Sequence, residues 1–161
     1  MFATQEESDF LLKHIQKHHS VLEYGSGNST LEISKLCDKL ISIEHQKDWY
    51  EYLITKIDSN TKLILKEPNE SYIEGTLCGT YNQFRDYITC PVEYGKFDII
   101  LIDGRARIEC AKSCKKMAKS NTLVFIHDFT SRLEIDNYKE VFNYLEIIES
   151  VGDMSKFKIK I

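Results

Sequence analysis

What this chain lacks limits what it can be. Its 161 residues include two prolines and no Gly/Ser-rich stretch, so we find no linker, repeat or low-complexity tract. No apolar run approaches the roughly 20 residues that a membrane helix needs. The polar, acidic start from Met1 to Asp9 also lacks the basic and apolar segments of a secretory signal. We therefore predict one domain, residues 1–161, without contact with a membrane.

Positive charge is also scarce. The net charge is −4 at pH 7, and no block of Lys or Arg offsets it. A general nucleic-acid binder needs a basic field that neutralises phosphates. We therefore expect a small-molecule or glycan substrate and no nucleic-acid partner.

The cysteines follow no zinc-binding pattern. Their number is odd, and two of them lie four residues apart on one expected helix, which alone does not make a metal site. The five are Cys37, Cys78, Cys90, Cys110 and Cys114. We interpret them as reduced thiols in the core of a cytoplasmic protein.

Helix-like and strand-like segments alternate along the chain. Capping boxes, Thr4-x-x-Glu7 and Ser29-x-x-Glu32, predict helices that begin near residues 5 and 29. Apolar segments predict strands at 20–24, 40–44, 62–66, 97–102 and 122–126. Segments 146–151 and 154–161, joined by a two-residue turn, predict an antiparallel hairpin after a helix at 138–145. The expected fold is α/β, a doubly wound, mostly parallel seven-stranded sheet with a C-terminal antiparallel hairpin.

The first chemical signal is a glycine turn after the first strand. Glu23 ends this strand, and Gly25, Ser26, Gly27, Asn28 and Ser29 lead into the next helix. Glycines let a backbone pass close to a ligand, and ligands bind beyond the carboxyl ends of parallel strands. The alternative is a tight turn that binds nothing.

The second signal lies at the end of the second strand. Glu44 can accept hydrogen bonds from two ribose hydroxyls. His45 and Trp49 follow it and can pack on an adenine. For Trp49, a place in the core of its own helix fits the pattern equally well.

Acidic residues also end the fourth and fifth strands. Asp103 ends the fourth, and His127 and Asp128 end the fifth. Adjacent parallel strands lie about 4.8 Å apart, so Asp103 and Asp128 can share one Mg²⁺ or Mn²⁺ ion if the fourth and fifth strands are neighbours. His127 is an alternative general base, and the plainest alternative is that His127 and Asp128 only cap the loop.

Two arginines follow Asp103. Arg105 and Arg107 indicate recognition of an anionic group on a substrate, or an ion pair that holds Asp103. A solvated helix face is the alternative for Arg107.

Glu23-x-Gly25-x-Gly27, Glu44-His45 and Asp103-Gly104, in this order, resemble class I S-adenosylmethionine-dependent methyltransferases. The resemblance implies that the turn from Gly25 to Asn28 holds the methionine part of S-adenosylmethionine and that Glu44 holds the ribose. It also implies that Glu23 binds the ligand's amino group or a nearby water. The longer pattern through His127-Asp128 is similar to enzymes that methylate sugar and polysaccharide hydroxyls, including plant glucuronoxylan methyltransferases.

This resemblance implies O-methylation of a sugar, glycan or small molecule, with His127, Asp103 and Asp128 as candidate catalytic residues. Related hydroxyl methyltransferases bind magnesium through acids at the places of Asp103 and Asp128. The Asn/Asp-Pro-Pro-Tyr/Phe motif of amine and base methyltransferases is absent from this sequence. Without a long N-terminal cap, we expect an acceptor pocket that is open or completed by a second copy of the chain.

Two other functions remain as alternatives. An NAD-dependent oxidoreductase also uses a glycine turn followed by an acid, although Thr30 stands at its third glycine position and the terminal hairpin does not suit it. The other alternative is a binding module that keeps the fold without the reaction.

Overall fold

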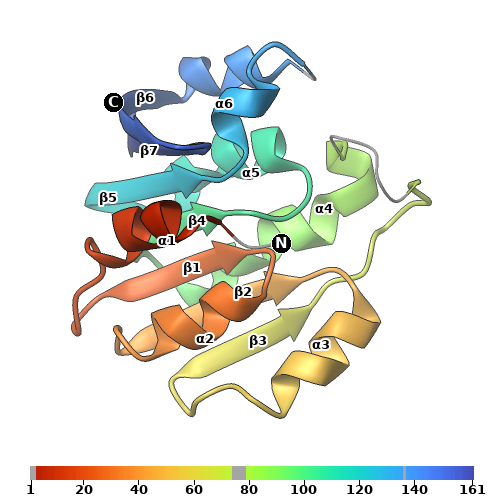
Figure 1. The fold of residues 1–161 in the computed structure, drawn as a ribbon. Coiled ribbons are helices and arrows are strands. Elements are labelled where there is room, and N and C mark those ends of the chain that lie inside the picture. Colours follow the sequence, from red (N-terminus) through yellow and green to blue (C-terminus); the bar gives the residue numbers. More distant parts are fainter. Residues whose placement is uncertain (1–2, 74–78, 136) are drawn as a thin grey trace.

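The computed structural model describes residues 3–73, 79–135 and 137–161, which form one sheet with helices on both faces (Figure 1). The strands are β1 (Ser20–Tyr24), β2 (Lys39–Glu44), β3 (Thr61–Leu65), β4 (Phe97–Ile102), β5 (Ala118–Ile126), β6 (Leu145–Val151) and β7 (Met154–Ile159). The α-helices are α1 (Gln5–Leu12), α2 (Asn28–Ser34), α3 (Lys47–Ile54), α4 (Tyr81–Thr89), α5 (Arg107–Ser113) and α6 (Phe129–Arg132). Three short 3-10 helices are η1 (Cys90–Tyr94), η2 (Cys114–Met117) and η3 (Tyr138–Asn143).

The strand order is β3-β2-β1-β4-β5-β7-β6. The first five strands in this order are parallel, and β7 runs antiparallel between β5 and β6. This arrangement confirms the predicted seven-stranded sheet with its terminal hairpin. It differs from the dinucleotide-binding fold of the oxidoreductase alternative, whose order is 3-2-1-4-5-6.

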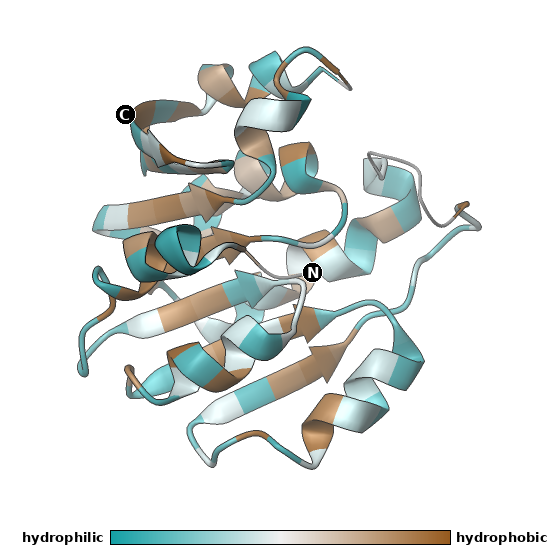
Figure 2. Cartoon of the chain, in the orientation of Figure 1, coloured by the Kyte–Doolittle hydropathy of each residue, from teal (hydrophilic) through white to brown (hydrophobic). Residues whose placement is uncertain are grey.

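Alternating side chains of the central strands build a core on each face of the sheet. Ile99 and Leu101 of β4 pack toward α1 and α2, whereas Ile100 and Ile102 pack toward α4 and α5. Figure 2 shows the hydrophobic residues concentrated along the strands, as expected for parallel strands that are covered on both faces. Within the described ranges, no helix has the length and apolar character needed to cross a membrane.

The cysteines described by the structure lie in these cores. Cys37, Cys90, Cys110 and Cys114 are buried free thiols, as the sequence predicts. Cys78 belongs to residues 74–78, which lie outside the described residues.

Several element boundaries differ from the predicted ones. The first helix, predicted from the sequence to span about residues 5–18, ends at Leu12, because the amides of His14 and Ile15 donate to carbonyls three residues back and tighten the chain. The fifth strand already begins at Ala118, and the expected helix at 138–145 is the 3-10 helix η3.

One of the two predicted capping boxes is wrong. Thr4 and Glu7 form the first box as predicted, with reciprocal hydrogen bonds of 2.7 and 3.3 Å. The second helix, however, has Gly27 as its N-cap, and the Gly27 amide donates to the Thr30 hydroxyl at 2.9 Å. The predicted capping residue, Ser29, instead donates its hydroxyl to Glu23.

Two glycine turns touch where β1 and β4 end. Gly25 has φ +90°, and a Cβ built on it would lie 2.6 Å from Gly104 Cα and 2.8 Å from the carbonyl carbon of Asp103. Gly27, in contrast, has extended backbone, and a Cβ there would meet no atom within 4 Å. Gly25 is therefore needed for the fold, whereas neither a positive φ nor a packed neighbour requires glycine at position 27.

This contrast predicts the effect of adding one methyl group. We expect Gly25→Ala to lower the free energy of unfolding by about 2 kcal/mol or more, because it adds a strained φ to a backbone clash. Gly27→Ala is the matched control, and we expect it to cost less than about 1 kcal/mol. Urea denaturation followed by circular dichroism measures both values. Equal stabilities for the two variants would contradict this account of the turn.

Candidate functional site

The carboxyl ends of β1, β2, β4 and β5 border one cleft with a volume of about 420 Å³. Nearly all residues predicted to form the site line it. They are Gly25, Ser26, Gly27, Asn28, Ser29, Glu44, His45, Asp103, Arg107, His127 and Asp128. Glu23 and Arg105 are not part of this lining.

Glu44 forms one wall of the cleft. Its Oε1 accepts hydrogen bonds from the amides of His45 and Gln46, both at 2.8 Å. Its Oε2 accepts one from the Ser26 hydroxyl at 2.6 Å and one from the Ser26 amide at 3.2 Å. Burial alone would raise the pKa of Glu44, but hydrogen bonds from His45, Ser26 and Gln46 outweigh it and lower this pKa. The cleft therefore has an ionised carboxylate at the end of β2.

Glu23 lies behind the glycine turn. Its carboxylate is fully buried and accepts hydrogen bonds from the hydroxyls of Ser29, Thr30 and Ser42. Direct contact with a ligand, which the resemblance implied, does not fit this placement, because the turn and the start of α2 cover the carboxylate. Glu23 instead ties β1, β2 and the start of α2 together, and burial raises its pKa to about 7 against the effect of the three hydroxyls.

His45 and Trp49 occupy different surroundings. The His45 ring lies among Tyr72, Phe84 and Tyr87, with centroids 5.9 to 6.1 Å away. Trp49 lies on the rim of the cleft, 36% exposed, and its indole donates to the Ser26 carbonyl at 2.8 Å. Trp49 is therefore not a core residue, and packing on an adenine remains a prediction for both side chains.

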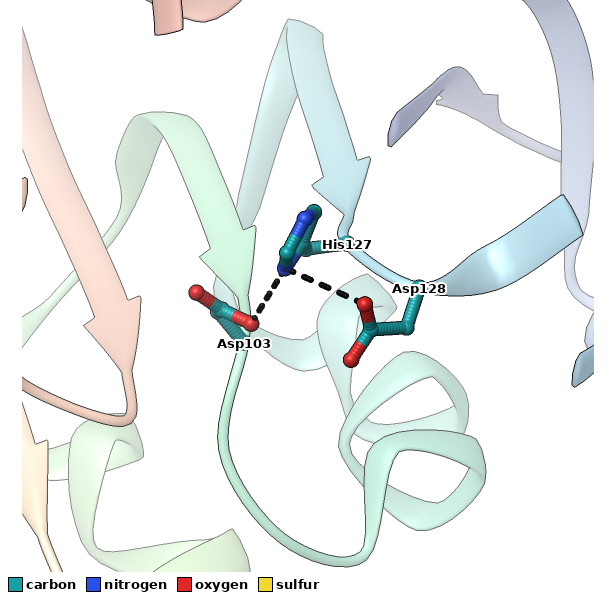
Figure 3. A group of neighbouring side chains, drawn as sticks. All are labelled: Asp103, His127 and Asp128. Atoms are coloured by element: carbon teal, nitrogen blue, oxygen red, sulfur yellow. Dashed lines mark hydrogen bonds and ion pairs between the residues drawn. The ribbon is translucent and has the colours of Figure 1, made fainter. Parts of the chain in front are cut away.

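The other end of the cleft holds Asp103, His127 and Asp128 (Figure 3). His127 Nδ1 lies 2.9 Å from Asp103 Oδ1 and 3.6 Å from Asp128 Oδ1. Because β4 and β5 are neighbours in the sheet, these residues meet as predicted. Burial lowers the pKa of His127, but the hydrogen bond and charge of Asp103 and the charge of Asp128 raise it overall.

Glu7 is a buried residue of this site that the sequence reasoning missed. Its Oε2 lies 3.5 Å from His127 Nε2, and its Oε1 accepts the Asp153 amide at 2.6 Å. Burial raises the pKa of Glu7, but the amides of Asp153 and Thr4 and the charge of His127 lower it overall. The capping box identified Glu7 as a helix residue, but no local pattern shows that α1 reaches the end of β5.

The two arginines take different positions. Arg107 is buried, with its guanidinium 3.4 Å from Asp103 and 3.2 Å from Asp128, so the predicted ion pair with Asp103 is present. The guanidinium of Arg105 instead lies over the ring of Tyr72, 5.3 Å from its centroid. The solvated-face alternative is thus wrong for Arg107.

Comparison with known proteins bears on the fold. No protein-family model matches the chain, and no curated protein matches it by sequence. A methyltransferase-like protein from Silicibacter pomeroyi is similar in structure, with a TM-score of 0.75 and 18% identity, over 99% of this chain and 88% of that protein. A TehB-like SAM-dependent methyltransferase from Corynebacterium glutamicum gives a TM-score of 0.63 at 12% identity, over 96% and 87% of the two chains.

The N-methyltransferase NodS from Bradyrhizobium japonicum, solved with S-adenosyl-L-homocysteine, gives a TM-score of 0.62 at 12% identity, over 95% and 83% of the chains. At these identities the similarity establishes the fold, which is the Rossmann-like fold of SAM-dependent methyltransferases. A shared fold does not by itself define the ligand or the reaction of this chain.

The raised pKa of Glu23 predicts a specific pH dependence of stability. Between pH 4.5 and about 7 the folded protein keeps a proton on Glu23 that the unfolded chain releases. The free energy of unfolding therefore falls as pH rises through this range, by at most roughly 3 kcal/mol. We expect Glu23→Gln to remove this contribution, so that the variant gains stability relative to wild type between pH 5 and 8.

Thermal unfolding of both proteins across this pH range measures the effect. Glu51→Gln is the control, because Glu51 is an exposed residue of α3. A stability difference between wild type and Glu23→Gln that stays constant with pH would contradict the assignment.

Proposed function

We propose that this chain is an S-adenosylmethionine-dependent methyltransferase that acts on a hydroxyl of a sugar, glycan or small molecule. The observation that carries the proposal is one cleft with Glu44 and the glycine turn at one end and Asp103, His127 and Asp128 at the other. The first end has residues that would hold a cofactor, and the acids of the second end line the same cleft.

The residues present fit the proposed cofactor. Gly27 lines the cleft at a place where the protein itself leaves room for a side chain, so a ligand can lie directly against the backbone. Glu44 already accepts a hydroxyl hydrogen bond, from Ser26, and a ribose hydroxyl needs the same acceptor chemistry. Trp49 offers an exposed aromatic face beside this position.

The acids at the second end supply what transfer to a hydroxyl requires. When bound, S-adenosylmethionine would supply an electrophilic methyl group on a sulfonium. The acceptor hydroxyl must lose its proton as its oxygen bonds to this methyl, so a base must stand beside it. Asp103 and Asp128 both line the cleft, and Asp128 is the more exposed, with 29% of its side chain accessible against 15% for Asp103.

His127 suits a positioning role better than that of the base. Carboxylates lie beside both of its ring nitrogens, Asp103 at Nδ1 and Glu7 at Nε2. These neighbours favour the doubly protonated imidazolium, which has no lone pair to accept a proton. We therefore assign the base to Asp128, with Asp103 and His127 fixing the geometry around it.

The proposed cofactor site is tested by Glu44→Gln. This variant keeps the shape of the side chain but removes its charge, and we expect S-adenosylhomocysteine to bind at least tenfold more weakly, a loss of about 1.4 kcal/mol or more. Isothermal titration calorimetry measures the affinity, with Glu51→Gln as the matched control on α3. An unchanged affinity in Glu44→Gln would remove the basis for the cofactor site.

The proposed base is tested by Asp128→Asn. Asn tolerates the left-handed backbone of this position, where φ is 53°, so the fold should be retained. We expect methyl transfer to fall by a factor of about 100 or more, while S-adenosylhomocysteine affinity changes less than about twofold. Transfer of labelled methyl to mono- and oligosaccharides measures activity, with the exposed Asp86→Asn as control.

Full activity of Asp128→Asn would contradict the assignment of the base. If wild type binds S-adenosylhomocysteine but methylates no hydroxyl acceptor of this panel, the alternative of a binding module is favoured over the enzyme.

A further inference from the structure

The guanidinium of Arg107 joins the ends of two strands. Ala106 has left-handed backbone with φ 49°, and Arg107 begins α5 directly after it. Arg107 Nε donates to the Gly104 carbonyl at 3.0 Å, and Nη1 donates to the carbonyl of His127. These bonds fix the plane of a cation that is 93% buried, since only 7% of the residue is exposed.

The same guanidinium lies between the two acids. Its Nη1 is 3.2 Å from Asp128 Oδ2, and its Nη2 is 3.4 Å from Asp103 Oδ1. A cation that bridges carboxylates at the ends of neighbouring strands occupies the electrostatic position of a divalent metal ion.

The spacing of the donor atoms, taken alone, would suit a metal ion. Ligand atoms of Asp103, His127 and Asp128 lie within 4.8 Å of one another. Their charge, however, is already balanced. Asp103 faces Arg107, Asp128 faces both Arg107 and Arg132, with Arg132 Nη2 at 3.0 Å from Asp128 Oδ2, and His127 lies between acids. A hard divalent ion needs carboxylates with uncompensated charge, so these residues do not fit a resident metal.

We propose that Arg107 is a built-in cation that replaces a divalent ion at this site, and that it masks a latent metal-binding site formed by Asp103, His127 and Asp128. Arg107 is thus a positioning residue, which holds the two acids at a fixed separation. One part of this inference, that these acids face the methyl acceptor, rests on the proposed function. The latent metal site itself follows from the contacts of Arg107.

Titration with Mn²⁺, followed by electron paramagnetic resonance of the free ion, tests the inference without any methyl acceptor. We expect wild type to bind Mn²⁺ no more tightly than about 1 mM, the weak end of protein sites for hard cations. We expect Arg107→Ala to bind it at least tenfold more tightly, and the added change Asp128→Asn to abolish that gain. Arg107→Lys is the matched control, since it keeps a cation at this position and should bind no more Mn²⁺ than wild type.

A folded Arg107→Ala protein that gains no Mn²⁺ affinity would overturn the inference. The S-adenosylhomocysteine affinity of the same variant, measured in parallel, is the control for an intact cleft. If Arg107→Ala does not fold, Mn²⁺ binding by the wild-type protein and by Asp128→Asn is the test. Micromolar Mn²⁺ binding by wild type that Asp128→Asn abolishes would show a resident metal site and overturn the inference, whereas no such binding supports it. Loss of cofactor binding in Glu44→Gln tests the proposed function separately, because Mn²⁺ binding does not involve Glu44.

Discussion

The direct contact between the turn after β1 and the turn after β4 is the constraint on which the site depends. β1 and β4 are neighbours at the point where the order of strands changes direction, so the chain leaves them toward opposite faces of the sheet. Gly25 and Gly104 let these two turns meet backbone to backbone. The side chains of the cleft then come from the end of β4 and from the two strands that flank the β1–β4 pair: Glu44 ends β2, Asp103 follows β4, and His127 and Asp128 follow β5.

The two ends of the cleft differ in how their charges are satisfied. At the first end, Glu44 lies against backbone amides, the Ser26 hydroxyl and the His45 ring, whose Nδ1 is 3.1 Å from Oε1. The Ser26 hydroxyl is a neutral donor that another hydroxyl can replace at small cost. At the second end, Asp103 and Asp128 are balanced by a buried guanidinium and an imidazole. The first end is therefore suited to exchange partners with a ligand, whereas the second is rigid before any ligand arrives.

The parts of the fold that depend on hydrophobic periodicity and on the order of the strands along the chain were predictable from the sequence. β4 is apolar from Ile99 to Ile102, so its end, and with it the place of Asp103, could be located from local pattern alone. The contacts made by Glu7 and the burial of Arg107 could not be located in this way, because they depend on how α1 and α5 pack against the sheet. The second capping box failed for a related reason. The buried Glu23, six residues before Ser29, competes for the serine hydroxyl that an isolated helix would use as its cap.

Glu7 also links the first helix to the turn between β6 and β7. Its carboxylate accepts the amide of Asp153, which lies 146 residues later in the chain, and the same carboxylate lies beside His127. Without the turn between β6 and β7, Glu7 therefore loses the amide that orients it, whereas the contact between His127 and Asp103 does not involve this turn. The acidic end of the cleft thus depends on a contact between the first helix and the turn before β7, whereas the hydrogen bonds that join Glu44 to the glycine turn form within the first 50 residues.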